Sequence, residues 1–340
     1  MEPAVVTILV CCAALIVVCD AVIHAVAVWR GLPVFEHAPR LEAPRRDPDP
    51  DAEPIEFPTA DGLTLRGAVY RPACTTPRGV VVFCPEFGAN HWSAATYVEG
   101  LIEAGFIVCA FDFRNQGESD ALPGYFPLHW PTTYERDDCL AAIEWVKSRE
   151  DLQGLPINLL GISRGGGAAL STAAISRDVA GVATDGAFSV DGLMYIYGLR
   201  WTELHIPPAI LRWIPRWHVR LSMLLVRWAS QWRRGCQYLQ LGRDLGRLRA
   251  KPTLLITGER DTYVPLEHAS ALYSRLNGHG EMWVVPGARH NRARQIDPAA
   301  YDHRLAAFFA GNAVETTARR VHRPVFVRSP QPNFECATES

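Results

Sequence analysis

The chain has 340 residues, of which 48% are hydrophobic and 21% are charged. This composition is typical of a folded globular protein and excludes a disordered, collagen-like or coiled-coil description of the whole chain. The formal net charge at pH 7 is −2, so the protein as a whole lacks the basic surface that nucleic-acid binding requires. We therefore expect no nucleic-acid partner.

An apolar segment, residues 4–29, lies near the start of the chain and is interrupted by Thr7, Asp20 and His24. As a helix it would be about 39 Å long, enough to span a bilayer with some tilt. A carboxylate in hydrocarbon is costly, but His24 follows Asp20 by one helical turn and can partner it. We predict a transmembrane anchor over residues 1–30. A cleaved secretory signal is the alternative, which the absence of Lys or Arg before the apolar run disfavours.

Residues 31–53 are rich in proline and aspartate, and we predict that they form a stiff linker between the anchor and a folded domain. Arginines follow the apolar segment and none precedes it. The positive-inside tendency therefore predicts a single-pass membrane protein whose folded domain lies in the cytoplasm. At the other end, residues 312–340 show no hydrophobic periodicity, and we predict a flexible tail.

Short apolar runs alternate with amphipathic stretches over residues 54–311. This rhythm predicts a mostly parallel sheet covered by helices on both faces. An alternating apolar and polar pair of runs predicts an antiparallel hairpin at one edge. The predicted strands are 54–58, 63–71, 79–84, 106–111, 156–161, 180–184, 252–257 and 281–285, and the predicted helices include 93–104, 133–149, 164–177, 266–277 and 297–310.

A G-x-S-x-G sequence, Gly161 to Gly165, follows the predicted strand 156–161 and precedes a helix of small residues. This context predicts a sharp strand-to-helix turn that exposes the hydroxyl of Ser163. The helix N-terminus adds backbone N–H groups and a positive dipole beside it. We predict that Ser163 is a nucleophile, with an ordinary capping serine in a glycine-rich turn as the alternative.

A serine nucleophile needs a base, and the base needs an acid that orients it. Asp261 and His290 each follow a predicted strand, so we expect both at the same sheet edge as Ser163. His290 is the only one of the eleven histidines in such a place. We predict that Ser163, His290 and Asp261 form the catalytic triad, with Asp185 as the rival acid.

Residues 54–311 resemble the α/β-hydrolase family, in particular its membrane-anchored bacterial esterases and its lysophospholipase-like and monoacylglycerol-lipase-like members. Besides the serine turn, Asp112–Ser119 (DFRNQGES) is similar to the family's D-x-R-G-x-G-x-S, and Gly258–Pro265 (GERDTYVP) to its G-x-x-D-x-x-V-P. The resemblance implies an α/β-hydrolase fold, a mostly parallel twisted sheet with a helical cap insertion, here at about residues 188–240.

The chain departs from the family at Pro85-Glu86-Phe87-Gly88, where His-Gly-x-Gly is common. The resemblance implies that the backbone N–H groups of Phe87 and Arg164 form the oxyanion hole. Glu86 would then place a carboxylate beside a site meant for negative charge. Either this side chain points away toward a cation, or the activity is weak or specialised.

The cap insertion predicts a helix after Pro215, over residues 216–234. One face of this helix is apolar and a stripe of arginines lies beside it. Such a helix suits a membrane interface or a lid over an acyl pocket. A cap helix packed on the core, with solvated arginines, is the alternative. The apolar residues are Trp217, Leu221, Leu224, Leu225, Trp228 and Trp232, and the arginines are Arg216, Arg220, Arg227 and Arg234.

Together these patterns predict a serine hydrolase that cleaves carboxylic esters, with lipid acyl esters as one candidate class, through an acyl-enzyme on Ser163. The alternatives are a peptidase or thioesterase with the same triad and a catalytically inactive, membrane-tethered scaffold. The chemistry needs no cofactor, and the nine cysteines contain no CxxC pair that would indicate zinc. We expect a small-molecule or lipid ester as substrate, and membrane contact through residues 4–29 and the 216–234 helix.

Overall fold

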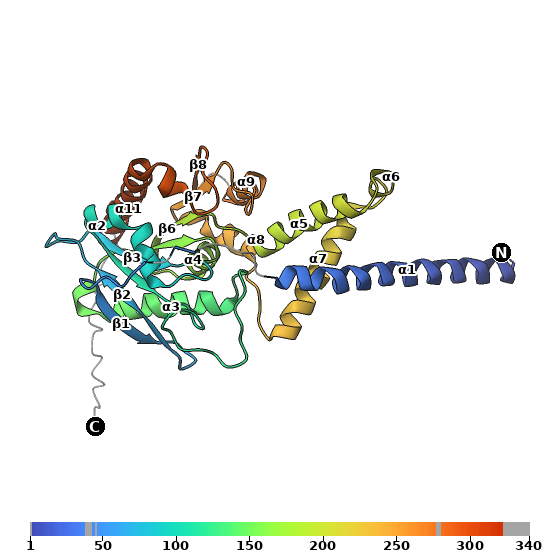
Figure 1. Cartoon of the computed structure of the whole chain (residues 1–340), viewed down its shortest axis with the longest axis horizontal. Coiled ribbons are helices and arrows are strands. Elements are labelled where there is room, and N and C mark those ends of the chain that lie inside the picture. The colour runs from blue at the N-terminus through green and yellow to red at the C-terminus, as the bar shows by residue number, and fades with distance from the viewer. Residues whose placement is uncertain (1, 38–42, 45, 277–279, 322–340) are drawn as a thin grey trace, which may run out of the picture.

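The structure, a computed structural model, describes residues 2–37, 43–44, 46–276 and 280–321. Its centre is an eight-stranded sheet in the order β1-β2-β4-β3-β5-β6-β7-β8 (Figure 1). The first two pairs in this order are antiparallel and the other five are parallel, which confirms the predicted mostly parallel sheet with an edge hairpin. The strands are β1 (Glu53–Pro58), β2 (Thr64–Tyr70), β3 (Gly79–Cys84), β4 (Phe106–Phe111), β5 (Ile157–Ile162), β6 (Val179–Asp185), β7 (Thr253–Gly258) and β8 (Gly280–Val285).

Apolar side chains are buried on both faces of the sheet. In β3, Val80 and Val82 belong to one core cluster, whereas Val81 and Phe83 belong to the other. Because successive strand residues point to opposite faces, a strand covered on both sides needs a continuous apolar run. The α-helices that supply residues to the first cluster are α3 (Thr133–Ser148), α4 (Arg164–Ile175), α8 (Leu241–Asp244) and α9 (Leu266–Arg275), and those of the second are α2 (Glu99–Glu103), α10 (Ala293–Ile296) and α11 (Pro298–Val321).

Two predicted helices differ from the structure. The stretch 93–104 is divided into the 3₁₀ helix η1 (His91–Thr96) and α2. The backbone N–H and the ring of His91 both contact the Asp112 carboxylate, which fixes the first turn independently of the second. At the other end, α11 continues ten residues into the predicted tail, and residues 322–340 lie outside the described part of the chain.

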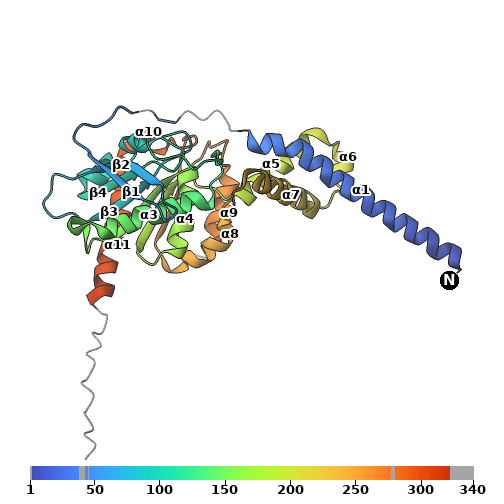
Figure 2. The same cartoon turned by 90° about the horizontal axis from the view of Figure 1, so that it is seen from below.

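The N-terminal apolar segment forms one helix, α1 (Pro3–Glu36), which extends away from the sheet (Figure 2). Within the described residues it is the one helix long and apolar enough to cross a membrane, a test that signal sequences also pass. It runs six residues beyond the expected end of the anchor, into the predicted linker. The linker is therefore shorter than the proline content suggested, since Pro33 lies inside the helix.

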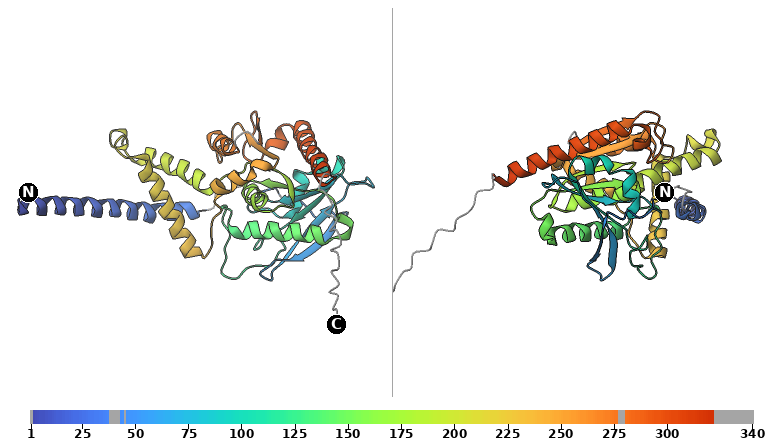
Figure 3. Two further views of the ribbon diagram at one scale, coloured as in Figure 1. Left: turned by 180° about the vertical axis from the view of Figure 1, so that it is seen from behind. Right: turned by 60° about the vertical axis from the view of Figure 1, so that its left-hand side comes forward.

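The cap insertion contributes α5 (Val190–His205), α6 (Pro208–Leu211) and α7 (Arg216–Arg234). Helices α5 and α7 project from the sheet domain; α7 packs against α1, and α5 packs against α7 (Figure 3). Four residues of α7 on one side are buried, namely Val219, Ser222, Val226 and Ser230. The helices approach closely at Gly31, where an added Cβ would lie 3.1 Å from a methyl group of Val226.

The apolar face predicted for α7 lies on the opposite side of this helix and is not packed on the core. Five of its six members are among the exposed large hydrophobic residues: Trp217, Leu221, Leu224, Trp228 and Trp232. The reason is that small and β-branched residues at i, i+3, i+7 and i+11 already form the packed side of the helix. The structure thus contradicts the alternative in which the Trp/Leu face covers the core.

The C-terminal end of α1 is attached to the catalytic side of the sheet domain. The Phe35 ring stacks on Trp130 with centroids 4.9 Å apart, and the Trp130 indole N–H donates to the Phe35 carbonyl at 2.8 Å. Ser230 donates to the Glu36 carboxylate at 2.7 Å, and Arg233 forms an ion pair with it. Helix α1 is therefore packed into the domain and is not a free tether.

Replacing Phe35 tests this attachment. Phe35→Ala removes a buried ring and leaves a cavity beside Trp130, which costs about 3 kcal/mol. We expect the melting temperature of the full chain in detergent to fall by about 5–10 °C. Val34→Ala is the matched control, because the neighbouring Val34 side chain is 64% exposed. Equal melting temperatures for the two variants would contradict the packing of Phe35 on Trp130.

Candidate active site

Ser163 occupies the turn between β5 and α4 in a strained conformation, with φ 50° and ψ −111°. Positive φ is costly for a non-glycine residue and is retained only where the surroundings enforce it. Here the glycines allow the close packing: a Cβ on Gly161 would lie 2.5 Å from the Gly165 carbonyl oxygen, and one on Gly165 would lie 2.1 Å from that of Cys84. The motif therefore forms the sharp turn predicted from the sequence.

Ser163, His290 and Asp261 come together from three loops at the carboxyl ends of β5, β8 and β7. The Ser163 Oγ lies 2.8 Å from His290 Nε2, and His290 Nδ1 lies 2.7 Å from Asp261 Oδ2. The other carboxylate oxygen of Asp261 accepts from the backbone N–H groups of Tyr263 at 2.9 Å and Val264 at 2.7 Å. These bonds orient the carboxylate, which in turn favours the tautomer that protonates Nδ1 and leaves Nε2 free to accept.

Asp185, the rival acid, is not paired with His290. Its backbone carbonyl accepts from the Ser163 N–H at 2.8 Å, while its Oδ2 is buried without a hydrogen-bond partner among the described residues. Burial, with the nearby charges of Asp261 and Glu86, raises the pKa of the Asp185 carboxyl to about 8. This carboxyl therefore remains mostly protonated at neutral pH and is unsuited to orienting a histidine through a negative charge.

Phe87 and Arg164, the predicted oxyanion-hole residues, are neighbours. The Arg164 guanidinium lies over the Phe87 ring at 5.6 Å. Arg164 is the first residue of α4, where backbone N–H groups have no intrahelical acceptor. The Phe87 N–H donates to no acceptor within the described residues. Neither N–H group thus has a hydrogen-bond acceptor among the described residues.

The Glu86 side chain is buried and contacts Tyr97. The side chain is 3% exposed, and its Oε1 accepts a 2.8 Å hydrogen bond from the Tyr97 hydroxyl. Burial raises the pKa of the Glu86 carboxyl above its ordinary value, which favours the neutral acid. The sequence offered a cation as one possible partner of Glu86, but in the structure the partner is the phenol of Tyr97.

From the sequence, Arg164 was predicted only to donate its backbone N–H. In the structure its side chain also contacts the Phe87 ring beside Ser163. The guanidinium is fully buried and forms an ion pair of 2.5 Å with Glu135 on α3. Tyr125 donates to the same carboxylate at 2.8 Å. Because the two partners are 29 positions apart on different helices, no local pattern indicated this pair.

A row of rings connects His290 with the end of α1. Tyr263 lies 4.9 Å from the His290 ring, and His129 lies 6.1 Å from Tyr263. His129 contacts Trp130 at 4.2 Å, and Trp130 stacks on Phe35. Burial lowers the pKa of the His129 imidazole to about 3, so it is neutral at physiological pH. The wall beside the Ser–His pair is therefore aromatic and uncharged.

The motif Asp112–Ser119 lies outside the Ser–His–Asp cluster and holds the loop after β4. The Asp112 carboxylate is fully buried and accepts from the His91 and Glu118 N–H groups. A Cβ on Gly117 would lie 2.0 Å from this carboxylate, so the turn requires glycine there. Its role is structural.

A family profile described as "Alpha/beta hydrolase family" matches residues 81–304, about two thirds of the chain. The chain belongs to the α/β-hydrolase family. The sheet order, the serine turn and the profile agree, which confirms the α/β-hydrolase fold expected from the sequence.

Individual relatives are more distant. The chain is 29% identical over 140 residues to an uncharacterised 31.7 kDa protein of Escherichia coli, and 28% identical over 130 residues to a thiohydrolase of Aspergillus aculeatus. These matches cover 41% and 37% of this chain, and the chain spans less than half the length of the relatives, 46% and 38%. An esterase of Pyrococcus furiosus is 20% identical with a TM-score of 0.56, over 80% of this chain and 98% of that one. This structural likeness shows a shared fold.

The raised pKa of Asp185 predicts that the stability of the folded chain depends on pH. Its pKa is 3.8 ordinarily and about 8 in the folded chain. Between these values the folded state holds a proton that the unfolded state has released, so raising the pH favours unfolding. We expect Asp185→Asn to reduce the fall in melting temperature between pH 5 and about pH 8. Asp137→Asn, on the exposed side of α3, is the control, and a slope unchanged by Asp185→Asn would contradict the prediction.

Proposed function

We propose that this protein is a serine hydrolase that cleaves carboxylic esters through an acyl-enzyme. Ser163 Oγ attacks the ester carbonyl carbon while His290 Nε2 takes its proton, and Asp261 stabilises the imidazolium that forms. The N–H groups of Phe87 and Arg164 stabilise the oxyanion. His290 then protonates the leaving alkoxide as the C–O bond breaks, and water attacks the acyl-enzyme by the reverse sequence of proton transfers.

The observation that carries this proposal is the continuous Ser163–His290–Asp261 contact, 2.8 Å and 2.7 Å long, on a strained turn. Family membership and neighbours named as esterases and thiohydrolases support a hydrolase of ester-like substrates. The thiohydrolase names also favour thioesters as a second candidate, since the same triad serves both bonds. A peptidase, which would cleave amide bonds with the same triad, is a further alternative. Glu86 is buried against Tyr97 and burial raises its pKa, which weakens the case for an inactive scaffold.

Active-site labelling tests the nucleophile. The full chain in detergent should react with a fluorophosphonate probe, whereas Ser163→Ala and His290→Ala should not. Ester turnover should fall at least about a thousandfold in Ser163→Ala, because the covalent route is removed. The full chain is required because Phe35 packs against Trp130. Unchanged melting temperatures control for folding, and labelling of the Ser163→Ala chain would refute the assignment.

We further propose that the substrate is a lipid ester taken from the bilayer. Helix α1 would span the membrane with the sheet domain on the cytoplasmic side. The exposed Trp/Leu face of α7 would then lie in the interface, since tryptophan favours the headgroup region. Trp228 is 64% exposed and Trp232 is 80% exposed. An acyl chain bound beside Ser163 would meet the aromatic wall near His290.

Replacing these two tryptophans separates lipid access from chemistry. Trp228→Ser combined with Trp232→Ser should lower turnover of a long-chain ester in vesicles at least about fivefold, because interfacial apolar area is lost. Turnover of a short, water-soluble ester should stay within about twofold, because the triad is untouched. Ile175→Ser, which changes an exposed apolar residue at the end of α4, is the control. Equal loss on both substrates would contradict membrane contact by α7.

A further inference from the structure

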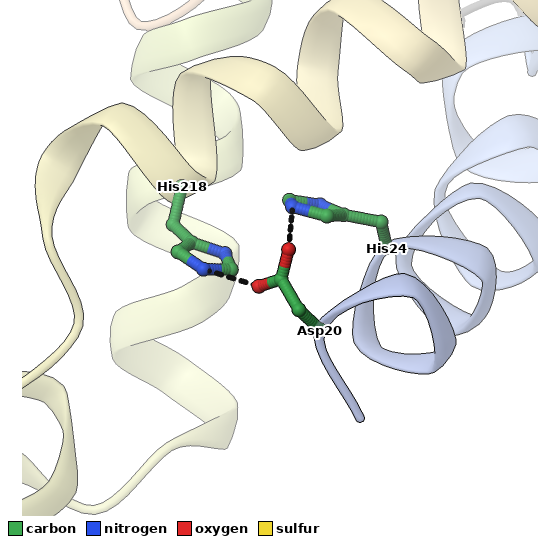
Figure 4. Close-up of side chains that lie close together, drawn as sticks. All are labelled: Asp20, His24 and His218. Carbon is green, nitrogen blue, oxygen red and sulfur yellow. Dashed lines mark ion pairs between the residues drawn. The ribbon is translucent and has the colours of Figure 1, made fainter. Parts of the chain in front are cut away.

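Three side chains of types that can bind metal ions lie together between α1 and α7, away from the triad. Figure 4 shows Asp20 and His24 on α1 facing His218 on α7. Asp20 Oδ1 lies 2.7 Å from His218 Nε2, and Asp20 Oδ2 lies 3.7 Å from His24 Nε2. One ligand atom from each residue lies within 4.8 Å of the other two. The two imidazole rings are stacked, with centroids 4.6 Å apart.

His24 is poised to bind a ligand through Nε2. It is 6% exposed, and this nitrogen has no hydrogen-bond partner among the described residues. The other ring nitrogen, Nδ1, lies 2.9 Å from the Ser222 hydroxyl of α7. A partner on Nδ1 fixes the ring orientation, and when Nδ1 carries the proton the Nε2 lone pair faces the cluster, the arrangement found around metal-ligating histidines.

We propose that Asp20, His24 and His218 bind one divalent transition-metal ion of the zinc class. Two imidazole nitrogens and one carboxylate oxygen are a donor set that zinc accepts, with a fourth position left for water. Ligand atoms around tetrahedral zinc are about 3.4 Å apart. The 2.7 Å between Asp20 Oδ1 and His218 Nε2 would therefore open slightly, and ligand atoms as much as 4.8 Å apart would close by about 1.4 Å. The Asp20 side chain is 40% exposed, which gives an entry path.

Such an ion would fasten the anchor helix to the cap. Asp20 is the single acid of the apolar segment, and a cation bound to it offsets the cost of placing a carboxylate there. At its other end α1 is held by Phe35 and Glu36. The metal would add a second attachment, within the apolar segment, between α1 and the first turn of α7. This proposal is independent of the esterase assignment.

Metal binding is measured on the full chain in detergent, purified without a polyhistidine tag and stripped with a chelator. Zinc is added, the excess is removed by desalting, and the retained zinc is counted by mass spectrometry. We expect about one zinc per chain. Cobalt in its place should give the intense visible absorption of a tetrahedral site.

His24→Gln and His218→Gln should each lose the bound zinc, and Ser222→Ala should weaken binding about tenfold through the lost orientation of His24. His205→Gln, on α5 outside the cluster, should retain the metal. Melting temperatures without metal show that each variant is folded. Added zinc should raise the melting temperature of the unsubstituted chain and of His205→Gln, but not that of His24→Gln or His218→Gln. Substoichiometric zinc in the unsubstituted chain, or full retention by both histidine variants, overturns the proposal.

Discussion

The strained turn at Ser163 is the constraint on which the catalytic half of the molecule depends. A serine at φ 50° is unfavourable by itself and is enforced by the packing of Gly161 and Gly165 against neighbouring backbone. The same packing places the end of β3, and with it Phe87, beside the first residue of α4. One turn therefore sets the positions of the hydroxyl and of both N–H groups proposed for the oxyanion.

The acidic side chains around this turn differ in their hydrogen bonds and in the effect of burial on their pKa. Asp261 is oriented by two backbone N–H groups and faces His290. Asp185 and Glu86 are buried without a cation, and burial raises the pKa of both. The region thus concentrates three carboxyl groups, of which Asp261 faces His290 and accepts two backbone hydrogen bonds.

The cap and the N-terminal helix form one structural unit with the sheet domain. Helix α7 buries its Ser/Val side and leaves its Trp/Leu side exposed, so packing against α1 is achieved with small residues. Phe35 then continues the aromatic wall that ends at His290. Helix α1 is therefore built into this wall, and it links the N-terminal part of the chain to the site in a way that a flexible tether would not.

The sequence by itself determined the elements that depend on local patterns. Continuous apolar runs placed the parallel strands to within about two residues, because a strand buried on both faces has no polar positions. The contact among Ser163, Asp261 and His290 was predictable for a related reason, since each lies just past the carboxyl end of a parallel strand and such strands end at one edge.

Only the tertiary structure decided what depends on contacts between distant segments. It showed that Glu86 is buried against Tyr97, that Arg164 pairs with Glu135, and that α7 exposes its tryptophans. It also brought His218 to Asp20 and His24, although no local metal signature exists in the sequence. An amphipathic pattern predicts that a helix has an apolar and a polar face. Which segment covers either face depends on tertiary packing, and a local pattern does not contain that information.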